Sequence, residues 1–304
     1  MKTKQLKAGS IINYGIPYQG SKTKIIPLVS RFFPNADNFY DLFGGGFSVS
    51  HYMLEHRFNS YKHFHYNEIR PGLSELIKDA IAGKYNYNVF KPEWISRDKV
   101  IKEKESNAYI KIIWSFGNNG TDYLFGKEIE SEKRSMHQAV VFNEFDDFMK
   151  DVFKITAWPS SLDITGRRLY LKLLCRKRVD LQQLERLQQL EQLERLQQLQ
   201  LTSLDYREVT IKDGSVVYCD IPYQGTADYG GFNHKEFFNW ASKQHHPVFI
   251  SEYNISDERF TLLKEFSHRS SFPAGGIKNT PVIERLYGNK TASKIIEEAR
   301  VKRL

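Results

Sequence analysis

Short apolar runs followed by amphipathic stretches mark two separate parts of this chain. "NFYDLF" (38–43) is followed by glycines and then by the helical pattern of "FSVSHYMLEH" (47–56). "HFHYNE" (63–68) is followed in the same way by "LSELIKDAI" (73–81), whose apolar residues recur at helical spacing. Strand, turn and helix twice in succession predict an α/β fold with a parallel, doubly wound sheet.

The last hundred or so residues return to the same kind of pattern. "GSVVYCD" (214–220) and "HHPVFISEYN" (245–254) each predict a buried strand that ends in polar residues. We predict a helix for "SDERFTLLKEF" (256–266), which follows them. The sheet is therefore expected to be divided along the sequence, with an insertion between its two parts.

The insertion, residues 84–180, lacks this regularity and combines aromatic, amide-rich loops with charged helical stretches. One such loop is "WSFGNNGTDYLFG" (114–126). The insertion ends in "GRRLYLKLLCRKR" (166–178), where six basic residues lie within twelve positions. A solvated helix face is one interpretation of that cluster, and a face that contacts phosphates is the other.

A low-complexity tract, "LQQLERLQQLEQLERLQQLQ", occupies residues 181–200 and carries leucine at every third position. On an α-helix each three-residue step falls short of a full turn by roughly 60°, so the leucines move around the helix. No single face is then expected to be buried, which argues against a simple coiled coil. We interpret the tract as a repeat-expanded helix or linker of variable length; a partner-binding element is the alternative.

Composition narrows the class of protein. The 304 residues suffice for one large domain or two small ones, and the net charge of +8 suits a polyanionic partner. The two cysteines, Cys175 and Cys219, form no C-x-x-C pair, which argues against a disulfide framework or a zinc site and favours a reducing cytoplasm. Neither a signal peptide nor a membrane-spanning segment is expected, because no sufficiently long apolar run occurs.

Candidate chemistry lies where the predicted strands end, since open α/β sheets bind ligands outside the carboxyl ends of their strands. "FGGG" (43–46) offers a turn that a ligand can approach, although it is not the G-x-G-x-x-G fingerprint. Glu68 is placed to accept hydrogen bonds from ribose hydroxyls. A structural turn and an ordinary strand-end acid are the competing interpretations. Other strand-end residues are Asp41, Asp205, Tyr206, Asp220, Ser251 and Glu252.

"CDIPY" (219–223) is more informative than the other strand ends. The Asp220 carboxylate and the Ile221 carbonyl can each accept a hydrogen bond from an amine, and Tyr223 can stack on a flat ring. These are the requirements of a site that holds the exocyclic amino group of a base. The pentapeptide I-P-Y-Q-G also occurs at 16–20, but no acid precedes that copy, so we assign the two copies different roles.

Several motifs together resemble the Dam-like DNA adenine-N6 methyltransferases, the D12 class in the α group. D-I-P-Y resembles their D-P-P-Y motif, "DLFGGG" (41–46) their F-x-G-G-G loop, and "PYQGSK" (17–22) their N-terminal W-A-G-G-K segment. "SFGNNGTDYLFG" (115–126) and "VIERLYGN" (282–289) are also similar to the family. The order of the motifs is that of the α group.

The resemblance implies a Rossmann-like class I methyltransferase sheet with an inserted, mostly helical target-recognition region. Residues 1–83 and 201–304 would form the catalytic domain and 84–180 the recognition region, with the repeat at 181–200 between them. It further implies transfer of a methyl group from S-adenosylmethionine to N6 of a flipped-out adenine at specific sites in double-stranded DNA. No metal is expected, a companion restriction endonuclease fits the family, and a monomer or weak dimer would suffice.

Site residues are carried over position by position. The cofactor-binding residues would be Tyr18, Lys22, Asp41, Phe43, Gly44, Gly45, Glu68, Asp205 and Tyr206. The target base would be held by Asp220, Ile221, Pro222 and Tyr223. DNA would be contacted by Arg167, Arg168, Lys172, Arg176, Lys177, Asn118 and Asn119.

Two departures from the family pattern keep other functions open. Ile221 replaces the usual proline, which preserves the carbonyl but makes the turn less rigid, and Tyr18 replaces the usual tryptophan. The alternatives are methylation of cytosine N4, of RNA or of a protein amide. A catalytically inactive homologue that binds DNA is the non-enzymatic alternative.

Overall fold

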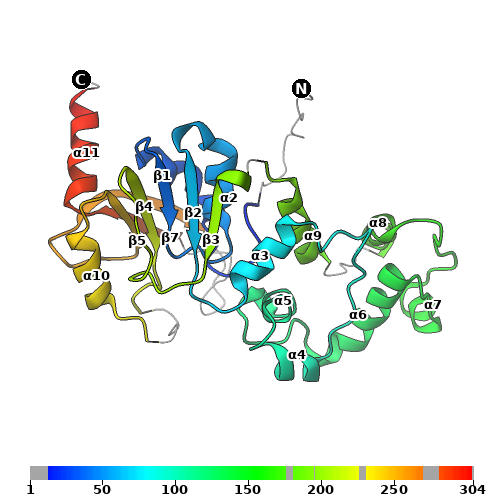
Figure 1. Ribbon diagram of the computed structural model, residues 1–304. Helices are drawn as coiled ribbons and strands as arrows, with labels where there is room; N and C mark the ends of the chain where they lie inside the picture. The colour runs from blue at the N-terminus through cyan, green and yellow to red at the C-terminus, as the bar shows by residue number, and fades with distance from the viewer. Residues whose placement is uncertain (1–12, 176–180, 195, 226–230, 270–280, 303–304) are drawn as a thin grey trace. The chain divides into compact units, whose positions relative to one another are not determined.

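The computed structural model describes residues 13–175, 181–194, 196–225, 231–269 and 281–302 (Figure 1). The chain divides into two compact units. The first comprises residues 1–15, 21–70 and 193–304, and the second comprises 16–20 and 71–192. None of the helices within the described residues is long and apolar enough to span a membrane.

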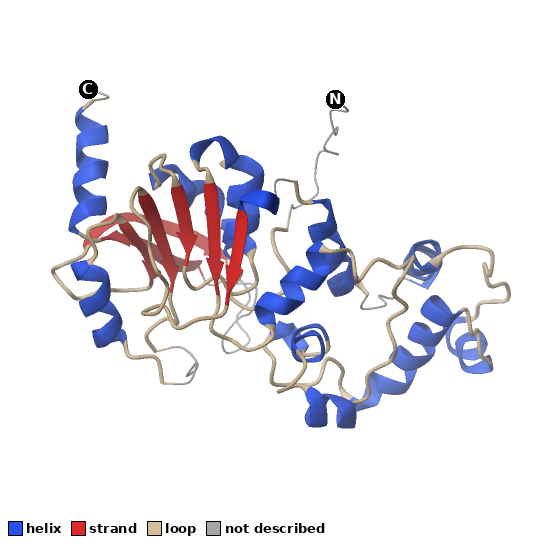
Figure 2. Ribbon diagram, in the orientation of Figure 1, coloured by secondary structure: helices blue, strands red, loops and turns tan. Residues whose placement is uncertain are grey.

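The first unit contains a seven-stranded sheet in the order β3-β2-β1-β4-β5-β7-β6 (Figure 2). The strands are β1 (Asn38–Asp41), β2 (His63–Asn67), β3 (Leu199–Thr202), β4 (Ser215–Asp220), β5 (Val248–Glu252), β6 (Thr261–Arg269) and β7 (Pro281–Gly288). The strands β1 to β5 are mutually parallel, whereas β7 runs antiparallel to β5 and β6. The strand order reverses between β1 and β4, as in Rossmann-like sheets. The predicted α/β sheet, divided by an insertion between β2 and β3, is confirmed.

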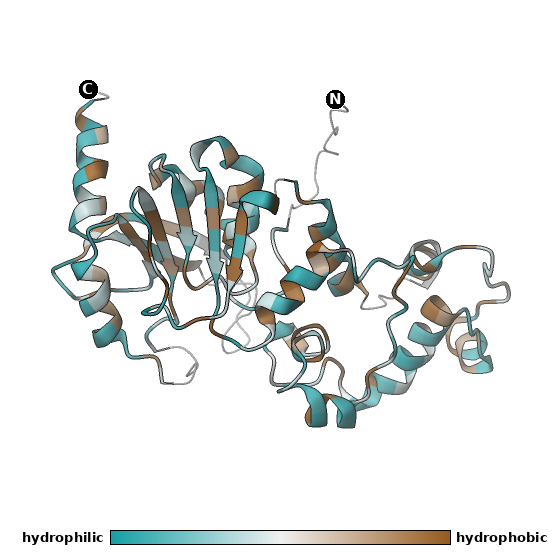
Figure 3. Cartoon of the chain, in the orientation of Figure 1, coloured by the Kyte–Doolittle hydropathy of each residue, from teal (hydrophilic) through white to brown (hydrophobic). Residues whose placement is uncertain are grey.

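Helices cover both faces of the central strands. The helices of this unit are α1 (Ile26–Val29), α2 (Ser48–His56), α10 (His234–Lys243) and α11 (Lys290–Val301). One face packs through Val217 and Ile250 against Phe237 of α10. On the other face the Phe33 ring lies 5.0 Å from the Phe249 ring, centroid to centroid. Burial on both faces explains the nearly continuous apolar runs of β4 and β5, which are brown in Figure 3.

The helix predicted for residues 256–266 is wrong. Residues 261–269 form β6, which pairs antiparallel with β7. The register shifts between Leu262 and Lys264, and this irregularity leaves Phe260, Leu263 and Phe266 buried at three-residue spacing. A bulge can therefore give a strand a pattern that resembles a helix, and pairing with β7 decides the outcome.

Asn289 joins the start of α11 to the start of β5. Its Oδ1 accepts hydrogen bonds from the backbone nitrogens of Val248 (3.1 Å) and Ala292 (3.0 Å). Its Nδ2 donates to the carbonyls of His246 (3.0 Å) and Gln244 (3.2 Å). The residue is 1% exposed, so water cannot replace these bonds.

Substitution Asn289→Ala is therefore expected to lower the free energy of unfolding by about 3–5 kcal/mol, because it removes a helix cap and leaves buried groups unpaired. Urea unfolding followed by circular dichroism measures the change. Asn254→Ala, at an exposed position of the same unit, is the matched control. A loss below about 1 kcal/mol, the size expected of a cap alone, would contradict the assignment.

The second unit is built from helices. These are α3 (Leu73–Ile81), α4 (Arg97–Glu103), α5 (Ala108–Ile113), α6 (Glu130–His137), α7 (Asp147–Phe153), α8 (Ile164–Cys175) and α9 (Gln182–Gln189). Among its described residues the only β-pairing is an isolated bridge between Ser115 and Tyr123. Its core includes Met136, Val140, Met149 and Leu171, all nearly inaccessible to solvent. The expected mostly helical insertion is thus observed, but α3 also belongs to this unit.

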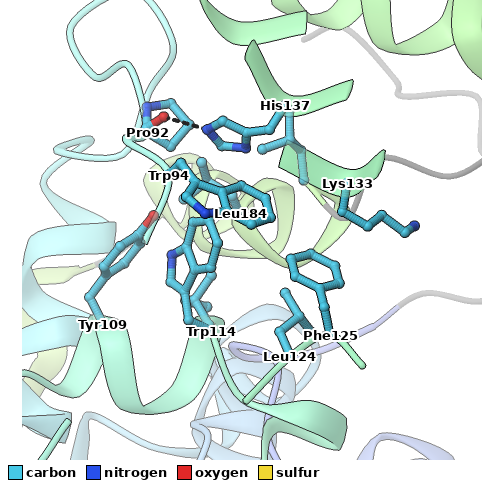
Figure 4. Close-up of a pocket in the computed structure, with 11 residues that line it drawn as sticks. Pro92, Trp94, Tyr109, Trp114, Leu124, Phe125, Lys133, His137 and Leu184 are labelled. Carbon is cyan, nitrogen blue, oxygen red and sulfur yellow. Dashed lines mark hydrogen bonds between the residues drawn. The ribbon is translucent and has the colours of Figure 1, made fainter. Parts of the chain in front are cut away.

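An aromatic cavity lies inside the second unit (Figure 4). Trp94 stacks on Phe125 with the ring centroids 5.3 Å apart, and His137 Nε2 lies 2.9 Å from the Pro92 carbonyl oxygen. The free volume of about 20 Å³ corresponds to roughly one water molecule. This cavity is too small for a nucleobase and belongs to the core of the unit.

The leucine repeat is packed more regularly than expected. Leu181, Leu184, Leu187 and Leu190 are all buried, so the prediction that no single face is covered is wrong for this part. The reason is that α9 is short and continues into a 3-10 turn, Leu190–Gln192, whose three-residue period keeps the leucines on one side.

Polar residues of the repeat are also engaged within the second unit. Arg186 Nη2 donates to the Ile16 carbonyl (2.8 Å), and Gln188 Nε2 donates to the Tyr85 carbonyl (2.7 Å). The unit boundary falls inside the repeat, after residue 192, and the last residues of the repeat begin β3. The structural units therefore divide at positions other than the expected domain boundaries at 83, 180 and 200.

Candidate active site

Acidic residues gather at one edge of the sheet. Asp41, Asp220 and Glu252 are the last residues of β1, β4 and β5, and Glu68 directly follows β2. These four strands are parallel, so their carboxyl ends share one edge, the usual ligand-binding edge of such sheets. Asp41, Glu68 and Glu252 are buried, and the side chain of Asp220 is 18% exposed.

Asp220 has one engaged and one open carboxylate oxygen. Its Oδ2 lies 2.9 Å from Lys22 Nζ. Its Oδ1 is buried and has no hydrogen-bond partner among the described residues. Burial raises the pKa of Asp220 to about 6, although the Lys22 ammonium opposes this shift. Oδ1 of Asp220 is therefore a strong hydrogen-bond acceptor to which no described residue donates.

Lys22 is held beside Asp220 by its own backbone. The Lys22 amide donates to Ser48 Oγ (3.1 Å), which joins the short turn Lys22–Lys24 to the start of α2. Nζ also lies 3.5 Å from Glu284 Oε2, so the ammonium faces two carboxylates. Burial disfavours the charge, but Asp220 and Glu284 outweigh it and raise the pKa of Lys22 to about 12.

Tyr223 forms an aromatic wall beside this ion pair. Its hydroxyl donates to Glu284 Oε2 (2.9 Å), and its ring centroid lies 4.9 Å from Lys22 Nζ. The ring of Tyr253 meets it edge-on at 4.6 Å. Both the orientation of Tyr223 and the position of its hydroxyl are thus determined by neighbours from distant parts of the chain.

The turn after Asp220 is held at several points. The Gln224 amide donates to Glu252 Oε2 (3.1 Å), and His234 Nε2 lies 2.7 Å from the Pro222 carbonyl oxygen. Ile221 is 2% exposed and packs in the core cluster that includes Phe237. These contacts supply rigidity that a proline at position 221 would otherwise provide.

The glycine loop after β1 is closely packed. A Cβ on Gly44 would lie 2.2 Å from the Tyr66 ring, so only glycine fits there. The Gly45 amide donates to Glu68 Oε2 (2.8 Å), which joins the loop to the acid after β2. Gly15, just before the first I-P-Y-Q-G, is equally tight, since a Cβ there would lie 2.1 Å from the Gly46 carbonyl.

Other predicted cofactor residues have structural contacts of their own. Asp41 Oδ2 accepts from the amide (3.2 Å) and hydroxyl (2.8 Å) of Ser50, while its Oδ1 is buried with no partner among the described residues. Burial raises the pKa of Asp41 to about 7. Tyr206 is 8% exposed and packs on Phe43, with the centroids 5.5 Å apart, as part of the aromatic core.

Two predicted cofactor residues remain outside this constellation. Asp205 Oδ1 accepts from Arg207 Nε (2.7 Å), a pairing that helps to lower the pKa of Asp205. Tyr18 is half-buried and belongs by its contacts to the second unit. Their roles in cofactor binding remain predictions.

The predicted DNA-contacting set needs revision. The Arg167 guanidinium is buried and donates to the carbonyls of Val140 (2.7 Å) and Leu162, and Arg168 pairs with Glu185. Asn118 Nδ2 likewise donates within the unit, to the Ile112 carbonyl (2.8 Å). Because all three nitrogens of the Arg167 guanidinium donate to carbonyls of its own unit, we remove Arg167 from the set, and the DNA contacts of Arg168 and Asn118 remain predictions.

The remaining members of that set differ in their surroundings. Lys172 is exposed on α8. Asn119 is partly buried, and its Nδ2 donates to Asp122 Oδ2 (3.0 Å) in a turn. Arg176 and Lys177 lie outside the described residues. We retain Lys172, Asn119, Arg176 and Lys177 as predicted DNA contacts.

Glu284 was not among the predicted site residues. It lies within β7, an antiparallel strand, so an argument from the ends of parallel strands could not find it. Its position in "VIERLYGN" was the only signal, because that stretch is similar to the family. Glu252 is a predicted strand-end acid, and the structure adds the hydrogen bond that it accepts from the Gln224 amide.

Comparisons with known proteins give a family match and a similar solved structure. The model of the D12 class N6 adenine-specific DNA methyltransferase family matches residues 18–258. A similar solved structure is the rRNA methyltransferase aviRa from Streptomyces viridochromogenes, with 13% sequence identity and a TM-score of 0.34 over 90% of this chain and 87% of that chain. No curated protein sequence matches the chain.

Proposed function

Because this chain belongs to the D12 class N6 adenine-specific DNA methyltransferase family, we propose that it methylates N6 of a flipped-out adenine at specific sites in double-stranded DNA. S-adenosylmethionine is the proposed methyl donor. The family membership makes the chain an adenine-specific DNA methyltransferase; the flipped base, the sequence specificity and the role of each residue are our proposals.

The open Oδ1 of Asp220 is the observation that supports the proposal most strongly. Buried carboxylate oxygens are normally hydrogen-bonded, so one without a donor suits a ligand that supplies an N–H group. The adenine amine is a poor nucleophile because its lone pair is delocalised into the ring. An N–H that donates to Asp220, and a second that donates to the Ile221 carbonyl, would localise that lone pair and stabilise the positive charge that develops on N6.

Tyr223 would stack on the displaced base and offset part of the stacking lost from the duplex. When bound, S-adenosylmethionine supplies a methyl group activated by a positively charged sulfur. Methylated N6 would carry a positive charge and would have to release one proton. We assign Asp220 as the acceptor of that proton, because its pKa of about 6 allows it to take and return a proton near neutral pH.

The charge at this edge of the sheet fits a cationic cofactor. Five acids lie there, Asp41, Glu68, Asp220, Glu252 and Glu284, and Lys22 is the only buried lysine among the described residues. A phosphate-bearing nucleotide would be repelled by such an edge, whereas S-adenosylmethionine carries a sulfonium and no phosphate. We assign Glu68 to the ribose, and Asp41 with Gly44 and Gly45 to the methionine moiety.

The second unit is our candidate for target recognition. The exposed Lys172 of this unit and the net charge of +8 of the whole chain are compatible with phosphate contacts. We also propose a companion endonuclease, a monomeric or weakly dimeric state and a cytoplasmic location.

A methylation assay tests the function directly. Purified protein is incubated with labelled S-adenosylmethionine and unmethylated double-stranded DNA, and the digested DNA is analysed for modified nucleosides. We expect N6-methyladenine alone, within one short sequence motif. Label in N4-methylcytosine, transfer only to RNA, or DNA binding with no transfer would each refute the proposal and identify the alternative.

A further inference from the structure

The position of Lys22 raises a difficulty for Asp220. An ammonium 2.9 Å from Asp220 Oδ2 would, on its own, cancel much of the negative charge of that carboxylate. A neutralised pair stabilises positive charge on a neighbouring amine less well than a free carboxylate does. Another negatively charged group must therefore lie beside this pair if Asp220 is to stabilise positive charge on the amine.

Glu284 is placed to supply this negative charge. Its Oε2 lies 3.5 Å from Lys22 Nζ and accepts the Tyr223 hydroxyl hydrogen bond at 2.9 Å. It is 8% exposed, so water screens these interactions weakly. Two carboxylates around one ammonium leave the cluster with one net negative charge.

We propose that Glu284 is a positioning residue of the methyl-transfer site, which shares the Lys22 ammonium with Asp220 and holds the Tyr223 ring through its hydroxyl. The inference rests on the proposed function, because it assigns Glu284 a part in that reaction. Glu284 acts through Lys22 and Tyr223, and we do not assign it a contact with the substrate.

The effect on Asp220 has a definite sign. The charged and titratable groups that surround Asp220 are Lys22, Asp41, Glu68, Tyr218, Cys219, Tyr223, Glu252, Tyr253 and Glu284. The Glu284 charge raises the pKa of Asp220 and the Lys22 charge lowers it. Removing the Glu284 charge takes away one of the influences that oppose Lys22, so the pKa of Asp220 falls. A purely structural Glu284 would not produce this shift.

The test is Glu284→Gln, which keeps the shape and still accepts the Tyr223 hydroxyl hydrogen bond. We expect kcat to fall by a factor of about 10–100. The rise of kcat/KM with pH, which reports ionisation of Asp220, should move to lower pH. Glu265→Gln, on the paired strand β6 in a more exposed ion pair with Arg285, is the matched control and should change neither quantity.

Two results would overturn the inference. One is that Glu284→Gln changes neither kcat nor the pH profile. The other is that it lowers kcat and the unfolding temperature but leaves the pH profile unchanged, which would indicate a structural role. If Glu284→Gln fails to fold, Glu284→Asp replaces it in the test. This variant keeps the negative charge, so it should have a reduced kcat with the wild-type pH profile. A shifted pH profile would contradict the inference.

The inference and the proposed function can fail separately. The Asp220 pKa can be measured without turnover, by carboxyl-carbon NMR of protein labelled at aspartate, with the Asp220 signal assigned by Asp220→Asn. An inactive wild-type protein would refute the proposed function alone. An Asp220 pKa that does not fall in Glu284→Gln would refute the charge-sharing inference alone.

Discussion

Asp220→Asn is expected to lower kcat for methyl transfer to adenine by a factor of at least about 10²–10³, with little change in the affinity for cofactor or DNA. Asparagine has the same shape but no charge. Its amide can present an N–H group to the target amine where Oδ1 of Asp220 presents an acceptor. Single-turnover assays with preformed complexes would measure the chemical step, and binding titrations would measure the two affinities.

Asp213→Asn is the matched control for this experiment. Asp213 precedes the same strand, β4, but lies at the opposite edge of the sheet with a fully exposed side chain. That variant should retain wild-type kcat. The assignment of Asp220 fails if Asp220→Asn loses less than about tenfold in kcat, or if the loss is explained by weaker binding alone.

Lys22→Met is expected to move the pH profile in the direction opposite to Glu284→Gln. Lys22 lowers the pKa of Asp220, so its removal raises that pKa, by about 1–3 units for a charge at this distance. Asp220 must be ionised to supply negative charge and to accept the proton from N6, and it would then ionise only at higher pH. Activity at pH 7 should fall by about tenfold or more and recover in part near pH 9.

Kinetics of Lys22→Met and Lys24→Met between pH 5 and pH 9 provide the measurement. Lys24 is exposed in the same short turn as Lys22, so its substitution controls for the loss of one positive charge. Circular dichroism must show a folded Lys22→Met, because the change leaves two carboxylates without their shared ammonium. A profile that stays in place, or moves to lower pH, would contradict the role of Lys22.

The elements near Asp220 were predictable because local sequence and tertiary structure agree there. A buried parallel strand requires a continuous apolar run, and "VVYC" before Asp220 is such a run. The same holds for the strands that end at Asp41 and Glu252. Strand-end acids then converge on one edge by the geometry of parallel sheets, without any further information.

Elements whose pattern of buried residues depends on contacts with other parts of the chain could not be predicted in this way. The buried positions of β6 follow a register shift against β7, and a local pattern cannot distinguish that from a helix. The leucines of the repeat share one side because a short helix continues into a 3-10 turn. Arg167 carries the charge of a phosphate contact, yet its guanidinium is used by carbonyls of its own unit.

The core strands β1, β2, β4 and β5, the glycine loop and the acid–proline–tyrosine turn could be predicted from the chain alone, because each is encoded within a few consecutive residues, and the order of the strands then located the insertion. The charge of the site depends instead on the folded structure. Lys22, Asp220 and Glu284 are far apart in the chain, and only packing brings the two carboxylates within 3.5 Å of the Lys22 ammonium. The balance among them depends on distance and burial, which no local pattern of residues encodes.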